Sequence, residues 1–321
     1  IVPHLPMAAP RGAEGDYPGS CNDDFKSDAM PARVRGELGV LYLTRNQHVE
    51  SLDILLKGGH WMDASYIAER VLTPDELLKY ITANWPRDEA PAKKDGDAIS
   101  PPDTNEQIRY LLARRLARLG RFKEAAPFYP EYWRPWFDVY AAAVTRSSTD
   151  GLRDKDYADA LWTAACIARY RGMELLGTEE APDWSSERGE YELDSASEIR
   201  QKPGYAKIAK DSPDEQARET AAAATVRPPN RFHYRYIAAE YAWKAASHLA
   251  DQDEKKAWLL CIGGTWLKNR DVASAERFYK ELVKRCNKTM LGREAAVKHW
   301  FPNVEIDEDA LLKEVAPKLT R

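Results

Sequence analysis

The chain of 321 residues is long enough to bury a substantial core, as one elongated body or as two lobes. Charged residues make up 31% of it, yet the net charge is only -4, so the overall charge favours neither nucleic acid nor an anionic membrane as a partner. No apolar run reaches the roughly eighteen residues that a spanning helix needs, which excludes a transmembrane segment.

Residues 1–31 are rich in proline and glycine and are predicted to form an extended N-terminal arm. The chain begins with Ile1, and its first residues lack the basic and apolar regions of a signal peptide. This start is consistent with a processed mature chain or with an artificial start point.

From residue 32 onward, apolar residues recur at helical spacing, which predicts a succession of helices. Thr73-Pro74-Asp75-Glu76 adds a capping box with proline at the first helical position. Residues 85–103 contain several prolines and are predicted to be a linker. In the first half of the chain, helices are expected at about 32–45, 49–57, 62–71, 74–83, 135–146 and 154–175, with a helical hairpin at 104–129.

Residues 177–230 interrupt this regularity, because they hold many prolines and glycines and few large apolar residues. Ser212-Pro213-Asp214-Glu215 repeats the earlier start signal, so a short helix through Ala224 is predicted inside the insertion. The remainder is either disordered or lies along the helices, held by Trp184, Tyr191 and Tyr205; we expect the second arrangement. Helices are expected again at about 231–249, 253–268, 272–286, 290–299 and 307–317.

A seven-position pattern occurs four times in one register along these helices. The first apolar residues of the pattern share one helical face, and a residue such as Gly120 or Asn46 ends that helix. An aromatic or β-branched residue then covers the turn. A small residue such as Ala125 lets a second helix approach the first. One such pair cannot bury its own apolar stripe, so neighbouring pairs must stack. The copies are Leu112, Ala113, Leu116, Gly120, Phe122, Ala125 and Tyr129; Ile262, Gly263, Trp266, Arg270, Val272, Ala275 and Tyr279; Leu38, Gly39, Tyr42, Asn46, His48, Ser51 and Leu55; and Ser51, Leu52, Leu55, Gly59, Trp61, Ala64 and Ala68.

The run from Leu112 to Tyr129, with its segment Gly120-Arg121-Phe122-Lys123-Glu124-Ala125, resembles a tetratricopeptide repeat (TPR). The segment from Leu259 to Leu282 resembles it too. The resemblance implies an all-α, TPR-like α-solenoid of stacked antiparallel helix hairpins, with a long irregular insertion. It divides the chain into the arm 1–31, N-terminal repeats 32–176, the insertion 177–230 and C-terminal repeats 231–321.

Two departures from the family pattern are visible: Arg109 stands where a large residue is expected early in the first helix, and no closing proline follows Leu282. The C-terminal block carries a second resemblance, to the repeats of envelope-associated bacterial TPR proteins. It rests on Ala275, Tyr279 and Leu282, on Thr289-x-Leu291-Gly292-x-x-Ala295, and on Trp300-Phe301-Pro302. Together with the start at Ile1, this similarity favours an extracytoplasmic location: periplasmic, envelope-bound or secreted.

Motifs of the common enzyme classes are absent: there is no G-x-x-x-x-G-K-[ST], G-x-G-x-x-G, H-E-x-x-H, G-x-S-x-G or C-x-x-C-H. We therefore predict a protein that is not an enzyme and has no cofactor. No histidine has a second His or Cys at ligand spacing, so no metal site is expected. The four cysteines include no C-x-x-C and are predicted to be buried thiols.

A dense group of arginine, histidine and aromatic residues is Arg231-Phe232-His233-Tyr234-Arg235-Tyr236. It fits an anion or acidic-peptide clamp at a helix start, with Arg231 and Arg235 on one face. It equally fits an amphipathic helix that packs its aromatic residues inward and exposes its arginines. We favour the second interpretation and keep Arg231 and Arg235 as candidate partner-binding residues.

The resemblance places further candidates on the concave face of the repeats, where TPR-like families bind peptide segments. These are Gln107, Tyr110, Arg114 and Arg118 in the central copy, and Leu260, Leu267 and Lys268 in the C-terminal copy. The alternative is that the arginines are solvated and paired with local acids. From these residues we select Tyr110, Arg114, Arg118 and Lys268 as candidates, and we add Trp184 from the insertion.

We therefore expect a non-enzymatic scaffold that binds a protein partner or peptide segment within a larger, bacterial extracytoplasmic assembly. One alternative is an all-α carbohydrate-binding or carbohydrate-active protein that uses exposed tryptophan and tyrosine side chains, such as Trp133 and Trp136, as stacking platforms. Another is a structural subunit of a filament or larger complex.

Overall fold

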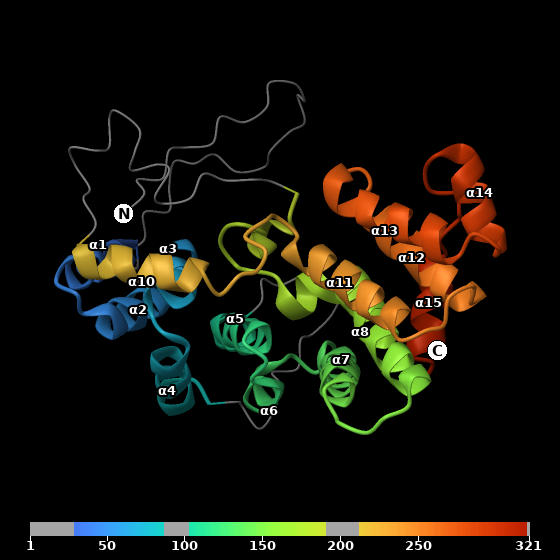
Figure 1. Ribbon diagram of the computed structural model, residues 1–321. Helices are drawn as coiled ribbons and strands as arrows, with labels where there is room; N and C mark the ends of the chain where they lie inside the picture. The colour runs from blue at the N-terminus through green and yellow to red at the C-terminus, as the bar shows by residue number, and fades with distance from the viewer. Residues whose placement is uncertain (1–28, 87–102, 191–211, 320–321) are drawn as a thin grey trace, which may run out of the picture. The chain divides into compact units, whose positions relative to one another are not determined.

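A computed structural model describes residues 29–86, 103–190 and 212–319 (Figure 1). Every regular element within these residues is helical, which confirms the all-α prediction. Most of the predicted N-terminal arm, Cys21, Tyr191 and Tyr205 lie outside the described residues. Contacts divide the chain into two compact units, the first formed by residues 1–108 and 193–223 and the second by 109–192 and 224–321.

The first unit begins with two hairpins that share a helix. Asn46 (φ 59°) and Gly59 (φ 73°) adopt the left-handed conformation at the two turns, as the repeated pattern predicts. Where the helices meet, the Ser51 hydroxyl donates to the carbonyl of Gly39 at 2.6 Å. The helices of this unit are α1 (Ala29–Thr44), α2 (His48–Lys57), α3 (Trp61–Tyr66), which continues as a π-helix (Ile67–Val71), α4 (Pro74–Asn84) and α10 (Pro213–Ala223).

The short helix predicted inside the insertion is α10, and it is bound to the hairpins of the first unit. Asp214 lies 2.9 Å from Nε2 of the buried His48. The Tyr66 hydroxyl donates to Glu215 at 2.8 Å, and Arg218 pairs with Glu76 at 2.8 Å. The short helix predicted inside the insertion is therefore confirmed, and it packs against the first unit.

In the second unit, α8 and α11 lie side by side, and α12 packs against α11 (Figure 1). Five alanines of α11, among them Ala238 and Ala242, are fully buried or nearly so, which allows close approach of the helices. Trp162 of α8 stacks on Trp266 of α12 with ring centroids 5.7 Å apart. The elements are α5 (Thr104–Arg118), which enters this unit at Arg109, α6 (Phe122–Ala125) with a 3-10 turn (Ala126–Phe128), α7 (Arg134–Ser147), α8 (Asp154–Leu176), a 3-10 turn (Ser185–Glu187), α11 (His233–Ser247), α12 (Glu254–Leu267), α13 (Val272–Arg285), α14 (Met290–Lys298) and α15 (Glu308–Val315).

Two details differ from the predicted hairpins. The second helix of the 104–129 hairpin is α6, which changes to a 3-10 turn at Ala126 because Pro127 has no N–H for the next helical bond. Val272 was expected to cover its turn, but it is 60% exposed, since it begins α13 on the solvent side. The assembly of the hairpins into a solenoid stays a prediction.

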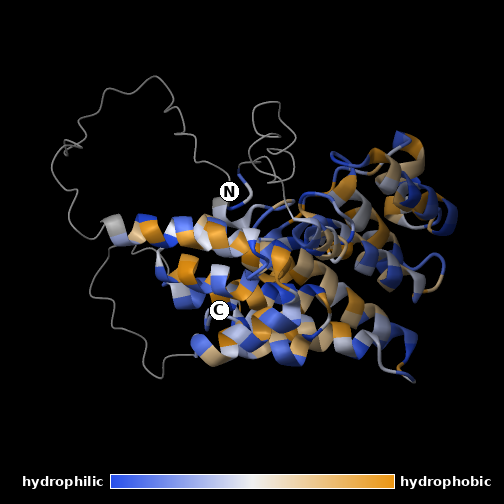
Figure 2. Cartoon of the chain, turned by 90° about the vertical axis from the view of Figure 1, so that its left-hand side faces the viewer, coloured by the Kyte–Doolittle hydropathy of each residue, from blue (hydrophilic) through white to orange (hydrophobic). Residues whose placement is uncertain are grey.

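The helices carry alternating apolar and polar bands along their length (Figure 2). No described helix is long and apolar enough to cross a membrane.

Candidate anion-binding site

The side chains predicted on α5 bind the end of α8 and the loop that follows it. The Tyr110 hydroxyl donates to the carbonyl of Glu174 at 2.5 Å, and Arg118 donates to the carbonyls of Leu176 and Gly177 at 3.1 and 2.8 Å. Arg114 pairs with Glu179 and lies over the Tyr110 ring, its guanidinium carbon 4.4 Å from the centroid. These residues attach the loop 177–190 to α5.

Burial corrects one expectation about these candidates. Arg114 is only 4% exposed, so it does not stand on an open concave face, and Trp184, the candidate from the insertion, is equally buried. The physical reason is that α5 faces the loop 177–190, whose Glu179 neutralises Arg114. A partner-binding role for Tyr110 and Arg118 stays a prediction.

The same loop fixes the start of α11 through one buried carboxylate, Asp183. Its oxygens accept the backbone N–H of Thr178 at 3.0 Å and of Phe232 at 2.6 Å, and one lies 2.9 Å from Nδ1 of His233. Burial alone would raise the pKa of Asp183, but the hydrogen bonds from His233, Thr178 and Phe232 hold this pKa below its ordinary value. Phe232 is thereby held at φ 59°, a left-handed conformation immediately before the helix.

Three guanidinium groups gather around the ring of Phe232. The guanidinium carbons of Arg231, Arg235 and Arg270 lie 4.9, 4.4 and 4.6 Å from its centroid. Arg231 and Arg235 flank the start of α11, and Arg270 comes from the turn between α12 and α13. The π-face of an aromatic ring attracts such cations, so Phe232 acts as their common platform.

A fourth guanidinium, that of Arg169 on α8, belongs to the same group, which we call the arginine cluster: Arg169, Arg231, Arg235 and Arg270. Burial and then repulsion from Arg235 lower the pKa of Arg169. The pKa of Arg270 is likewise lowered, first by burial and then by Arg235 and Arg231. Neighbouring positive charge therefore disfavours the charged form of Arg169 and of Arg270.

Three of the four members of the arginine cluster have no carboxylate partner within the described residues. Within them, Arg169, Arg235 and Arg270 form no ion pair. Glu308, whose charge acts on Arg169, is already paired with Arg171 at 3.0 Å. A planar guanidinium presents donors that match carboxylate and phosphate oxygens, so the cluster is suited to bind an anion.

Sequence reasoning found half of this cluster. It selected Arg231 and Arg235 but missed Arg169 and Arg270 as site residues, because these come from α8 and from another turn. One signal was available: Arg270 occupies the turn position where the other copies of the pattern have glycine or asparagine. Lys268 lies half-buried at the end of α12, and no contact of the described residues brings it to the Phe232 ring.

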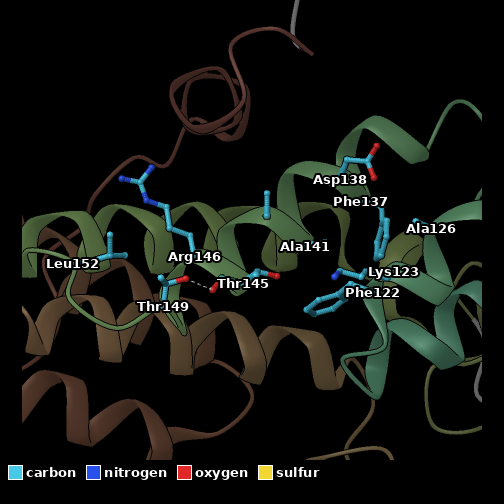
Figure 3. A pocket seen from close by; sticks show the side chains of 11 residues that line it. Phe122, Lys123, Ala126, Phe137, Asp138, Ala141, Thr145, Arg146, Thr149 and Leu152 are labelled. Carbon is cyan, nitrogen blue, oxygen red and sulfur yellow. Dashed lines mark hydrogen bonds between the residues drawn. The ribbon is translucent and has the colours of Figure 1, made fainter.

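A separate apolar hollow of about 500 Å³ lies between α6 and α7 (Figure 3). Phe122 and Phe137 line one end, and Thr149, whose hydroxyl donates to the carbonyl of Thr145 at 3.1 Å, lies toward the other. Of its charged lining residues, Asp138 pairs with Arg134 at 2.7 Å and Arg146 with Asp156 at 3.7 Å. Lys123 is its remaining charged lining residue.

The histidines and cysteines of the described residues have structural surroundings. His248 ends α11, stacks on Tyr157 at 5.0 Å and lies 3.1 Å from Asp154. Cys166, Cys261 and Cys286 are free thiols and buried, as predicted. No group of three His, Cys, Asp or Glu side chains in this part of the chain is placed to hold a metal ion.

Comparison with models of protein families, with curated proteins and with solved structures gives no match.

Proposed function

We propose that the protein is a non-enzymatic helical scaffold that binds an acidic segment of a protein partner at the arginine cluster. The observation that carries this proposal is the gathering of three guanidinium groups within 4.9 Å of one ring centroid, with no carboxylate of the described residues to neutralise Arg235 or Arg270. Like charges brought together are unfavourable unless a ligand of opposite charge compensates them. A peptide with glutamate or aspartate side chains supplies such a ligand.

A protein partner is favoured over the two alternative classes. The net charge of -4 opposes general attraction to nucleic acid. A carbohydrate-binding platform of tryptophan side chains is disfavoured, because every tryptophan of the described residues is buried or half-buried, including Trp133 and Trp136. The TPR-like stacking of hairpins and a bacterial extracytoplasmic assembly belong to this proposal and rest on the resemblance of the sequence.

The test is the affinity of the full chain for a fluorescently labelled oligo-glutamate peptide, measured by fluorescence anisotropy. Wild type is expected to bind, and Arg270→Gln is expected to weaken binding about tenfold, because one charge-assisted contact is lost. Arg293→Gln on α14 removes an exposed arginine outside the cluster and is the matched control. Equal affinities of Arg270→Gln and wild type, or absence of binding to wild type, would contradict the proposal.

A further inference from the structure

A groove of about 490 Å³ lies along α11. Its residues come from α11, from the end of α12, from α13 and from the segment that precedes α11. They are Arg227, Pro228, Tyr236, Ile237, Glu240, Tyr241, Lys244, Leu267, Ser274 and Arg277. We call it the α11 groove.

The α11 groove combines an apolar lining with a cationic rim. Leu267 is 2% exposed, and Ile237 and Tyr241 are half-buried, so they form its apolar part. Among the three cationic lining residues, Arg277 pairs with Glu240 at 2.6 Å, whereas Lys244 and Arg227 have no ion pair within the described residues. The rim therefore keeps a positive charge, which is complementary to an acidic ligand.

The groove adjoins the arginine cluster. Tyr236, which lines it, follows Arg235 directly in α11. Arg270 also donates its backbone N–H to the carbonyl of Leu267, another residue that lines the groove, at 2.9 Å. If Arg235 and Arg270 bind an acidic side chain of an extended ligand peptide, the next residues of that peptide lie beside the α11 groove.

We propose that the α11 groove binds an apolar side chain that follows an acidic residue in the partner, so that the ligand is an acidic segment with interspersed leucine, isoleucine or phenylalanine. This inference rests on the proposed function, because the cluster supplies the anchor for the acidic residue. The groove adds selectivity: burial of one large apolar side chain strengthens binding about tenfold over a small polar one at the same place.

The experiment compares two labelled peptides by fluorescence anisotropy with the full chain. In one, glutamates alternate with leucine, and in the other they alternate with serine. Wild type is expected to bind the glutamate–leucine peptide about tenfold more tightly. Ile237→Gln, which places a polar side chain of similar length in the groove, is expected to remove this preference and leave the affinity for the glutamate–serine peptide unchanged.

Val297→Gln is the matched control, because Val297 is an apolar residue on α14 that is 80% exposed and outside the groove. The inference is overturned if wild type binds both peptides equally, or if the preference survives in Ile237→Gln. In either case the proposed function stands as long as Arg270→Gln weakens binding of both peptides. If neither peptide binds wild type, the proposed function fails as well. Tighter binding of a single-stranded oligonucleotide than of either peptide would overturn the identity of the occupant, since stacking on Tyr236 and Tyr241 can also serve bases.

Discussion

At the scale of single residues, Asp183 organises the site without facing a ligand. It is fully buried and accepts two backbone N–H groups from segments that are far apart in sequence, at Thr178 and Phe232. In this way Asp183 fixes Phe232, the residue between Arg231 and the start of α11. The sequence offered no signal for this role, because a lone aspartate in an irregular insertion has no periodic context.

Asp183→Asn is expected to lower the free energy of unfolding at neutral pH by about 3 kcal/mol, because a buried, hydrogen-bonded charge is replaced by an amide with fewer acceptors. The pKa of Asp183 lies below its ordinary value of 3.8 in the folded protein. Its contribution is therefore fully present above that value and is lost as the pH falls through the lower, folded pKa. The difference between wild type and variant should narrow in urea titrations carried out below pH 3.8.

The exposed Asp309 of α15 supplies the control, and Asp309→Asn should change stability by no more than about 0.5 kcal/mol. The account of Asp183 would be contradicted if the free energies of unfolding of wild type and Asp183→Asn differed little at neutral pH. It would also be contradicted if this difference grew on acidification.

At the scale of elements, the helices were predictable because their signals are local. The capping box at Thr73 forms as expected, with the Glu76 N–H bonded to the threonine hydroxyl at 3.2 Å and the Thr73 N–H to the glutamate at 2.8 Å. Gly120 adopts φ 72° at its turn, as the pattern requires. The early end of α6 departs from the predicted hairpin, because Pro127 cannot donate the next helical hydrogen bond.

The small residue at the contact of two helices is the feature of the hairpins that is easiest to test. A Cβ added at Gly263 would lie 2.8 Å from Cε1 of Phe278 and 3.0 Å from Cβ of Ala242. Gly263→Leu should therefore lower the free energy of unfolding by at least about 2 kcal/mol through overpacking, as measured by chemical denaturation. Ala273→Leu, at an exposed position of α13, should change it by less than about 0.5 kcal/mol. Equal stability of the two variants would mean that α11, α12 and α13 do not meet closely at Gly263.

At the scale of the whole molecule, the sequence predicted which segments are helical but not which side chains meet. Arg114 is a clear case: its helical position was right, yet its burial against Glu179 depends on a loop that no periodicity describes. The arginine cluster is another, since Arg169 and Arg270 join Arg231 and Arg235 only through the packing of α8, α11 and α12. The candidate site therefore forms through contacts between residues far apart in the sequence, whereas the helices follow from local sequence patterns.

The central claim is that repulsion among the guanidinium groups of the arginine cluster destabilises the folded protein and that an acidic ligand relieves this repulsion. Thermal unfolding of wild type and Arg270→Gln, with and without the glutamate–leucine peptide, tests this claim most directly. Without peptide, Arg270→Gln should unfold at the same or a higher temperature than wild type, because the substitution removes the repulsion between the Arg270 guanidinium and those of Arg235 and Arg231. With peptide, the unfolding temperature of wild type should rise more than that of the variant, since a ligand that binds only the folded state stabilises it. A variant that is less stable than wild type alone, together with no rise for wild type on adding peptide, would contradict the claim.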